Sequence, residues 1–129
     1  MATGAKLLIH TMWDVTIVNF EEARVLESAQ IEQIGQELYR LVDAMDRKKL
    51  ILDFSKVQFL ASGAVGVVIS LQKKMAAARG RLVICGLRKA LMRVFGILKV
   101  EKLFTFCPDE AQALNVFGVT LPPPEVPPP

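Results

Sequence analysis

The chain has 129 residues, of which 52% are hydrophobic and 22% charged, and its formal net charge is +3 at pH 7. This length and composition indicate one globular domain whose core is large enough to fold without disulfides or metal ions. The two cysteines, Cys85 and Cys107, lack the spacing of a zinc site, which indicates core thiols in a reducing compartment. We find no signal peptide and no membrane-spanning segment in the sequence, and therefore expect a cytoplasmic protein.

Basic residues concentrate in the second half of the chain. Between Ala61 and Lys102 there are nine basic residues and one acid, Glu101. A solvated helix face explains such a run most simply, and a surface for an acidic partner or an anionic lipid is the sharper alternative. Direct binding of nucleic acid is not expected, because the basic positions match no known reader motif.

The first elements along the chain are a predicted hairpin and a predicted helix. Residues Lys6–Met12 and Val15–Phe20 have the pattern of two strands, joined by a tight turn at Trp13-Asp14. Ser28 can then cap a helix. Apolar residues recur after it at helical spacing and predict one buried face: Ile31, Ile34, Leu38, Leu41, Val42 and Met45.

The middle of the chain predicts two strands around a long helix. Lys48–Phe54 has the continuous apolar content of a strand covered on both faces. A helix from about Ser62 to Arg79 follows, and Gly80 is expected to end it in the left-handed conformation. Arg81–Cys85 is the next predicted strand.

The remaining pattern completes an alternating arrangement of strands and helices. Arg88–Phe95 predicts a short helix closed by Gly96, and Phe104–Phe106 predicts a short strand. Pro108 is expected in the first turn of a last helix that runs to about Val116. The expected fold class is therefore α/β, with a mixed sheet of four to five strands, an initial hairpin and about four helices packed mainly on one face.

The C-terminal residues are rich in proline and read as a tail. Residues 119–129 include Leu121-Pro-Pro-Pro-Glu-Val-Pro-Pro-Pro, which predicts a polyproline-II or disordered extension. We therefore place one domain at residues 1–118. A role in proline recognition is the alternative to a passive tail.

The usual catalytic patterns are absent from the sequence. His10 is the only histidine, and its spacing from Ser62 does not support a Ser-His-acid triad. The sequence contains no phosphate-binding loop and no dinucleotide fingerprint, and no second carboxylate at a readable spacing joins Asp53. We therefore expect no enzyme activity, no catalytic residue, no metal site and no cofactor.

The segment around Ser62 carries the strongest functional signal. Ser62 is expected at the N-terminus of the long helix, where its hydroxyl can accept a hydrogen bond from a free backbone N–H as a cap. A phosphate on this hydroxyl would lie at the favoured end of the helix dipole. Ala61, Gly63, Ala64 and Gly66 are all small, so this turn can approach a neighbouring backbone or a partner closely.

Several segments in order resemble the STAS domain of bacterial anti-sigma factor antagonists. The resemblance covers about Leu7 to Val116 and is carried by these pieces: Leu50-Ile-Leu-Asp-Phe-Ser-Lys-Val-Gln-Phe-Leu-Ala-Ser-Gly-Ala-Val-Gly, Gly80-Arg-Leu-Val-Ile-Cys-Gly-Leu, Leu91-Met-Arg-Val-Phe-Gly-Ile-Leu, Lys102-Leu-Phe-Thr-Phe and Asp109-Glu-Ala-Gln-Ala-Leu. In that family, a motif similar to Asp-Ser-Ser-Gly-Leu-Gly stands where this chain has Ala61 to Gly66.

The resemblance implies a phosphorylation switch. In the family, an anti-sigma factor that is also a serine kinase phosphorylates the first serine of the motif, which breaks the complex, and a serine phosphatase resets it. That serine falls on Ser62, while Ala61 replaces the motif Asp and Gly63 and Ala64 replace the second Ser and the Gly. We expect the partner to dock on the segment Phe59, Leu60, Ala61, Ser62, Gly63, Ala64, Val65 and Gly66.

Two further roles occur among domains that the chain resembles. One is a non-enzymatic scaffold in a stress-signalling assembly. The other is a partner subunit of a lipid or anion transport system, which would be the only route to membrane contact and would suit the basic residues. Co-purification distinguishes these roles from antagonism, because each predicts a different partner.

Overall fold

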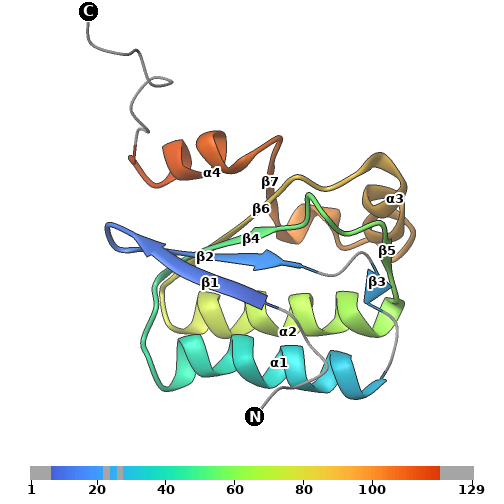
Figure 1. The fold of residues 1–129 in the computed structure, drawn as a ribbon, viewed down its shortest axis with the longest axis horizontal. Coiled ribbons are helices and arrows are strands. Elements are labelled where there is room, and N and C mark those ends of the chain that lie inside the picture. The colour runs from blue at the N-terminus through green and yellow to red at the C-terminus, as the bar shows by residue number, and fades with distance from the viewer. Residues whose placement is uncertain (1–6, 22–23, 26–27, 120–129) are drawn as a thin grey trace, which may run out of the picture.

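The computed structural model describes residues 7–21, 24–25 and 28–119, and its largest element is a five-stranded mixed sheet (Figure 1). The strand order is β1-β2-β4-β6-β7, in which β1 is antiparallel to β2 and the other neighbours are parallel. The bounds of these strands are Leu7–Met12 for β1, Val15–Phe20 for β2, Lys49–Asp53 for β4, Arg81–Cys85 for β6 and Thr105–Cys107 for β7. The predicted mixed sheet with an initial hairpin is confirmed.

Four helices cover the sheet within the described residues. They are α1 (Ser28–Asp43), α2 (Ser62–Ala77), α3 (Lys89–Ile97) and α4 (Glu110–Val116). Figure 1 shows α1 and α2 side by side under one face and α4 over the opposite face. Side chains of α3 join the same core as those of α1 and α2, so the expected packing of helices mainly on one face is confirmed.

The central strand β4 is apolar throughout because both of its faces are covered. Leu50 and Leu52 point into the core formed with α1, α2 and α3, whereas Ile51 between them packs into a second core under α4. Successive side chains of a strand point to opposite faces, so each core receives alternate residues. The run is therefore buried on both sides, and Asp53 stands at the end of β4.

Three small elements escaped the sequence prediction. Strand β3 (Arg24–Val25) pairs in parallel with β5 (Phe59–Leu60) in a separate two-stranded sheet. A single 3₁₀ turn spans Glu101–Leu103. None of these three elements is long enough to produce a readable hydrophobic period, because a period needs several residues to repeat.

The ends of α1 and α2 differ from the prediction. Helix α1 stops before Met45, whose side chain is exposed rather than on the buried face. The left-handed residue after α2 is Arg79, with φ 62°, and Gly80 is not left-handed. Gly80 is instead required by space, since a Cβ there would lie 2.7 Å from Met75 Cε and 2.8 Å from the carbonyl oxygen of Lys48.

The ends of α3 and α4 also differ in detail. Helix α3 continues through Gly96, and the left-handed residue beyond it is Lys99, with φ 59°. Helix α4 is capped by Asp109, whose Oδ1 accepts a hydrogen bond from Gln112 N at 2.9 Å. Pro108 therefore precedes the cap and does not lie in the first turn as expected.

Some predictions fall on residues outside the described part of the chain. These are Lys6 at the start of the first strand, the capping side chain of Ser28, and tail residues 120–129. Val119, assigned to the tail, is described: its N–H donates to Leu114 O at 3.0 Å, and its side chain packs against the core under α4. The packed part of the domain thus reaches Val119. No described helix is both long enough and apolar enough to cross a membrane.

Candidate functional site

Helix α2 begins one residue earlier than a cap at Ser62 would require. Ala61 is the N-cap, with φ −71° and ψ 152°, and its carbonyl accepts from Ala64 N at 2.9 Å and Val65 N at 3.2 Å. Ser62 is the first helical residue, and no side chain caps this helix. The prediction that Ser62 caps α2 is therefore wrong, because Ala61 already occupies the extended position from which a side chain can cap.

The Ser62 hydroxyl lies in an environment that favours an anion. Ser62 is exposed, and the first turn of α2 contains no acidic residue. The N–H groups of Ser62 and Gly63 open the helix, where no carbonyl one turn earlier can accept from them. These groups and the helix dipole would both stabilise negative charge at this position.

The predicted docking segment divides into exposed and buried residues. The exposed ones are Phe59, at 43%, with Ser62, Gly63 and Gly66, and Ala61 is half-buried. The side chains of Leu60, Ala64 and Val65 belong to the main core instead. Only the first group can contact a partner directly, while the second group fixes the position of the turn.

The small residues of α2 leave its surface open. A Cβ on Gly63 would meet Ile31 Cδ1 at an ordinary 3.6 Å, and a Cβ on Gly66 would meet nothing within 4 Å. The absence of a side chain at Gly66 is therefore not required by packing among the described residues. It leaves space on the exposed side of the first turns of α2.

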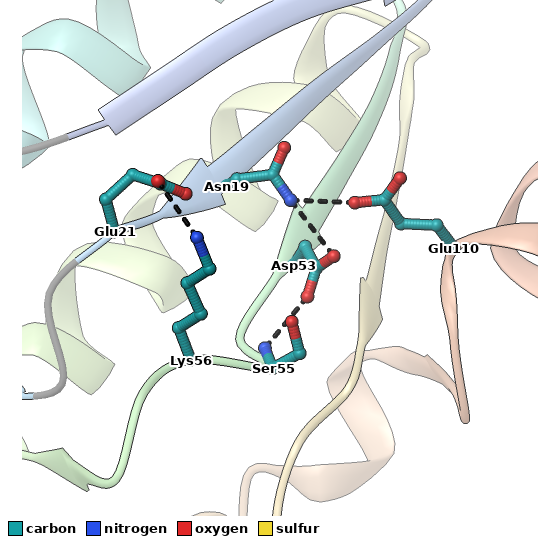
Figure 2. A network of polar contacts seen from close by, with 6 residues as sticks. All are labelled: Asn19, Glu21, Asp53, Ser55, Lys56 and Glu110. Atoms are coloured by element: carbon teal, nitrogen blue, oxygen red, sulfur yellow. Dashed lines mark hydrogen bonds and ion pairs between the residues drawn. The ribbon is translucent and has the colours of Figure 1, made fainter.

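A polar cluster stands at the carboxyl end of β4, toward the α4 side of the sheet (Figure 2). Asn19 Nδ2 donates to Asp53 Oδ2 at 3.0 Å and to Glu110 Oε2 at 2.7 Å. Asp53 Oδ1 accepts from the backbone N–H of Ser55 at 2.8 Å. The cluster joins the ends of β2 and β4 to the start of α4, and Asp53 itself is only 8% exposed.

The pKa values of the two carboxyl groups in the cluster are shifted in opposite directions. The side-chain hydrogen bond to Asp53, together with burial, raises the pKa of Glu110 to about 6. Burial alone would raise the pKa of Asp53, but hydrogen bonds with Glu110, Ser55 and Asn19 outweigh it and lower that pKa. Glu110 therefore carries the proton that the pair shares in mildly acidic solution.

Sequence reasoning noticed Asp53 but missed its partners. Asn19 and Asp53 are register partners on neighbouring parallel strands, and Glu110 opens the helix that follows β7. Polar residues that end neighbouring parallel strands meet at one edge of a sheet, and this rule could have predicted the contact between Asn19 and Asp53. The sequence spacing did not indicate the contact with Glu110.

The other candidate residues take structural positions. His10 lies on the edge strand β1, opposite Ile17. Cys85 and Cys107 are free thiols that face one another in register, and burial raises the pKa of both. Among the described residues, no group of three histidine, cysteine, aspartate or glutamate side chains is placed to hold a metal ion.

The strands of the main sheet and the four helices occur in the order that the sequence predicts. Residues 7–113 match the family model of the STAS domain. The chain belongs to the STAS domain family. A curated relative, the "Putative anti-sigma factor antagonist BtrV" of Bordetella bronchiseptica, is 30% identical over 98 residues, which cover 76% of this chain and 84% of the relative.

Solved structures share the fold of this STAS domain. An anti-sigma-factor antagonist (STAS) domain protein from Planctomyces limnophilus superposes with a TM-score of 0.76 at 17% identity, covering 87% of this chain and 97% of the other. The Bacillus cell fate determinant SpoIIAA in its phosphorylated form gives a TM-score of 0.67 at 17% identity, covering 87% of this chain and 99% of the other.

Proposed function

We propose that this STAS domain is an anti-sigma factor antagonist that binds an anti-sigma factor with serine kinase activity, and that phosphorylation of Ser62 ends the binding. The observation that carries the proposal is that Ser62, in the first turn of α2, is exposed and that its hydroxyl does not cap the helix. A serine that capped the helix would be held by backbone N–H groups. Ser62 is instead available to a kinase.

The segment around Ser62 suits a partner that binds through apolar and uncharged contacts. No charged residue occurs between Val57 and Gln72, so the first turns of α2 contribute no charge of their own to this surface. Phe59 supplies an exposed aromatic side chain, and Gly66 leaves space for a side chain of the partner. Aromatic anchors and pockets of this kind carry much of the binding energy in protein interfaces.

Phosphorylation would change this surface more than it changes the fold. The phosphate adds about one and a half to two negative charges at neutral pH, to a segment, residues 57–72, that has no charged residue. Removing such a charge from water to re-form the interface is costly. The fold tolerates the charge, because the N-terminus of α2 stabilises it by roughly 0.3–1 kcal/mol.

The direct test is phosphorylation by the cognate anti-sigma factor kinase, identified by its co-purification with this chain. The purified chain is incubated with that kinase and ATP, and the modified residue is identified by peptide mass spectrometry. We expect one phosphate on Ser62 and loss of co-elution of the phosphorylated chain with the kinase. A serine phosphatase should restore co-elution.

Ser70 provides a matched control, since it is an exposed serine on the same helix. Ser62→Ala should abolish phosphate uptake, and Ser70→Ala should leave it unchanged. Equal uptake by the wild type and Ser62→Ala, or phosphate on another residue, would contradict the proposal. Co-purification of a membrane transporter subunit in place of a kinase would point to the transport role.

A further inference from the structure

A basic pocket lies at the end of the sheet opposite Ser62. Its volume is about 340 Å³, and four cations line it: Lys48, Lys49, Arg79 and Arg81. Lys49 and Arg81 are register partners that begin β4 and β6, so the pocket lies at the amino ends of parallel strands. Val116 and Phe117, at the end of α4, form its apolar side.

The two lysines of the pocket already have partners. Lys48 Nζ lies 2.8 Å from Asp46 Oδ1 and donates to Ala78 O, at the end of α2, at 2.7 Å. Lys49 Nζ lies 2.7 Å from Asp14 Oδ2, beside the hairpin turn. The carboxylates therefore balance the lysines, and the hydrogen bond to the helix end accounts for the position of Lys48.

The two arginines are not balanced in this way. Both are exposed, and neither has an ion pair with any residue in the described ranges 7–21, 24–25 and 28–119. Arg79 also adopts a left-handed backbone conformation, with φ 62°, which places a long cationic side chain where chains usually put glycine or asparagine. The pocket thus has an excess of two positive charges beside an apolar wall.

We propose that this pocket binds a phosphate monoester dianion that carries an apolar group. Two guanidinium groups match the charge of a monoester dianion and can each hold phosphate oxygens through paired N–H donors. The apolar group would contact Val116 and Phe117. The volume lies in the range of small-molecule sites, which combine apolar walls with a few polar groups that fix orientation.

The proposed site is separate from the docking face. Ser62 begins α2, whereas Arg79 and Gly80 follow its last turn. No residue of the pocket belongs to the segment from Phe59 to Gly66. The two proposals can therefore fail independently.

Phenyl phosphate is a suitable probe, because it is a dianion at about pH 8 and carries one aromatic ring. We expect saturable binding of one molecule per chain by calorimetry, with amide shifts in NMR spectra confined to residues 48–49, 79–81 and 116–117. Arg79→Ala and Arg81→Ala should each weaken binding by about tenfold or more, since each removes a charge-assisted contact.

Arg93→Ala is the matched control, because Arg93 is an exposed cation on α3 outside the pocket. It removes the same charge and should leave the affinity within about twofold. Vesicles that contain phosphatidic acid test whether the same chemistry is recognised on a lipid surface. The assay uses the full chain, and a melting curve for each variant verifies that it is folded.

Three results would overturn the proposal. One is the absence of saturable binding of phenyl phosphate at millimolar concentration. Another is an equal loss of affinity in Arg81→Ala and Arg93→Ala, which would reveal only an effect of net charge. The third is binding to phosphatidic acid vesicles without binding to phenyl phosphate, which would assign the arginines to a membrane surface.

Discussion

Asp53 and Glu110 accept hydrogen bonds from one amide nitrogen, Asn19 Nδ2, at 3.0 and 2.7 Å. An amide nitrogen carries two hydrogens, so each carboxyl group receives one of them. The interaction of Glu110 with the neighbouring Asp53 carboxyl group, together with burial, raises the pKa of Glu110 to about 6. The junction between the sheet and α4 is therefore sensitive to pH.

Glu110→Gln should remove that sensitivity. The folded pKa of Glu110 lies above its ordinary value of 4.5, so its contribution to stability is complete below about pH 4.5 and is lost as the pH rises through about 6. Glutamine keeps an acceptor for Asn19 and a donor for Asp53 at every pH. The variant should match the wild type near pH 4.5 and be more stable at pH 7, by less than about 1 kcal/mol after solvent screening.

Urea unfolding at several pH values between 4.5 and 7.5 measures this difference. Glu32→Gln is the control, since Glu32 is exposed on α1. Its curve should run parallel to that of the wild type. A Glu110→Gln curve that also runs parallel would mean that the two carboxyl groups are not coupled.

Ser62→Ala and Asp109→Ala should separate a serine that does not cap from an aspartate that does. Ser62 makes no capping bond to α2, so its replacement should change the free energy of unfolding by less than about 0.5 kcal/mol. Asp109 caps α4, and its replacement should cost about 1 kcal/mol. Denaturant unfolding at constant pH compares the two variants. A loss of about 1 kcal/mol in the free energy of unfolding of Ser62→Ala would show that Ser62 does cap α2.

Gly66→Ala and Gly80→Ala should have opposite effects on stability. A Cβ at Gly66 meets open space in the interior of α2, so the better helix propensity of alanine should add about 0.5–1 kcal/mol. A Cβ at Gly80 meets the backbone of Lys48 at 2.8 Å, and the resulting shift should cost about 1–3 kcal/mol. Thermal melting measures both, and a melting temperature lowered by Gly66→Ala would mean that the position is not open.

Gly66→Leu should keep the fold and weaken binding of the anti-sigma factor. The leucine side chain would fill the space next to Ser62 that the partner is proposed to use. Ala76→Leu adds a comparable apolar side chain at the exposed far end of α2 and should bind normally. Affinities from surface plasmon resonance would count against this docking face if the two variants bound equally well.

Sequence reasoning succeeded where local pattern and tertiary position agree. The turn at Trp13-Asp14 separates two apolar runs, and the strand Arg81–Cys85 has the predicted bounds, because it is buried on both faces between a helix end and a glycine turn. It failed at Gly80 and Gly96, which were both expected to end a helix, whereas the left-handed residues beyond α2 and α3 are Arg79 and Lys99. Gly80 is required by the backbone of Lys48, which is distant in sequence, so local propensity assigned it the wrong conformation.

The candidate site was only partly predictable for the same reason. Ser62 could be found from the motif that the chain resembles, but its freedom from capping depends on a helix that begins at Ser62, one residue earlier than a serine cap allows. Burial of Leu60 and Val65 depends on contacts with several other elements. The pair of Asp53 and Glu110 joins two segments that only the folded topology brings together.

Helix α2 has consequences for how the two proposed sites could influence one another. Its 16 residues separate Ser62 from Arg79 by about 24 Å at 1.5 Å per residue. The Debye length at physiological salt is about 8 Å, so charge at one end is largely screened from charge at the other. If ligand binding at the arginines altered phosphorylation, the signal would have to travel as a rigid displacement of α2 against the sheet. Added salt would then leave the coupling between the two sites intact, although it would lower the affinity of the arginines for the ligand.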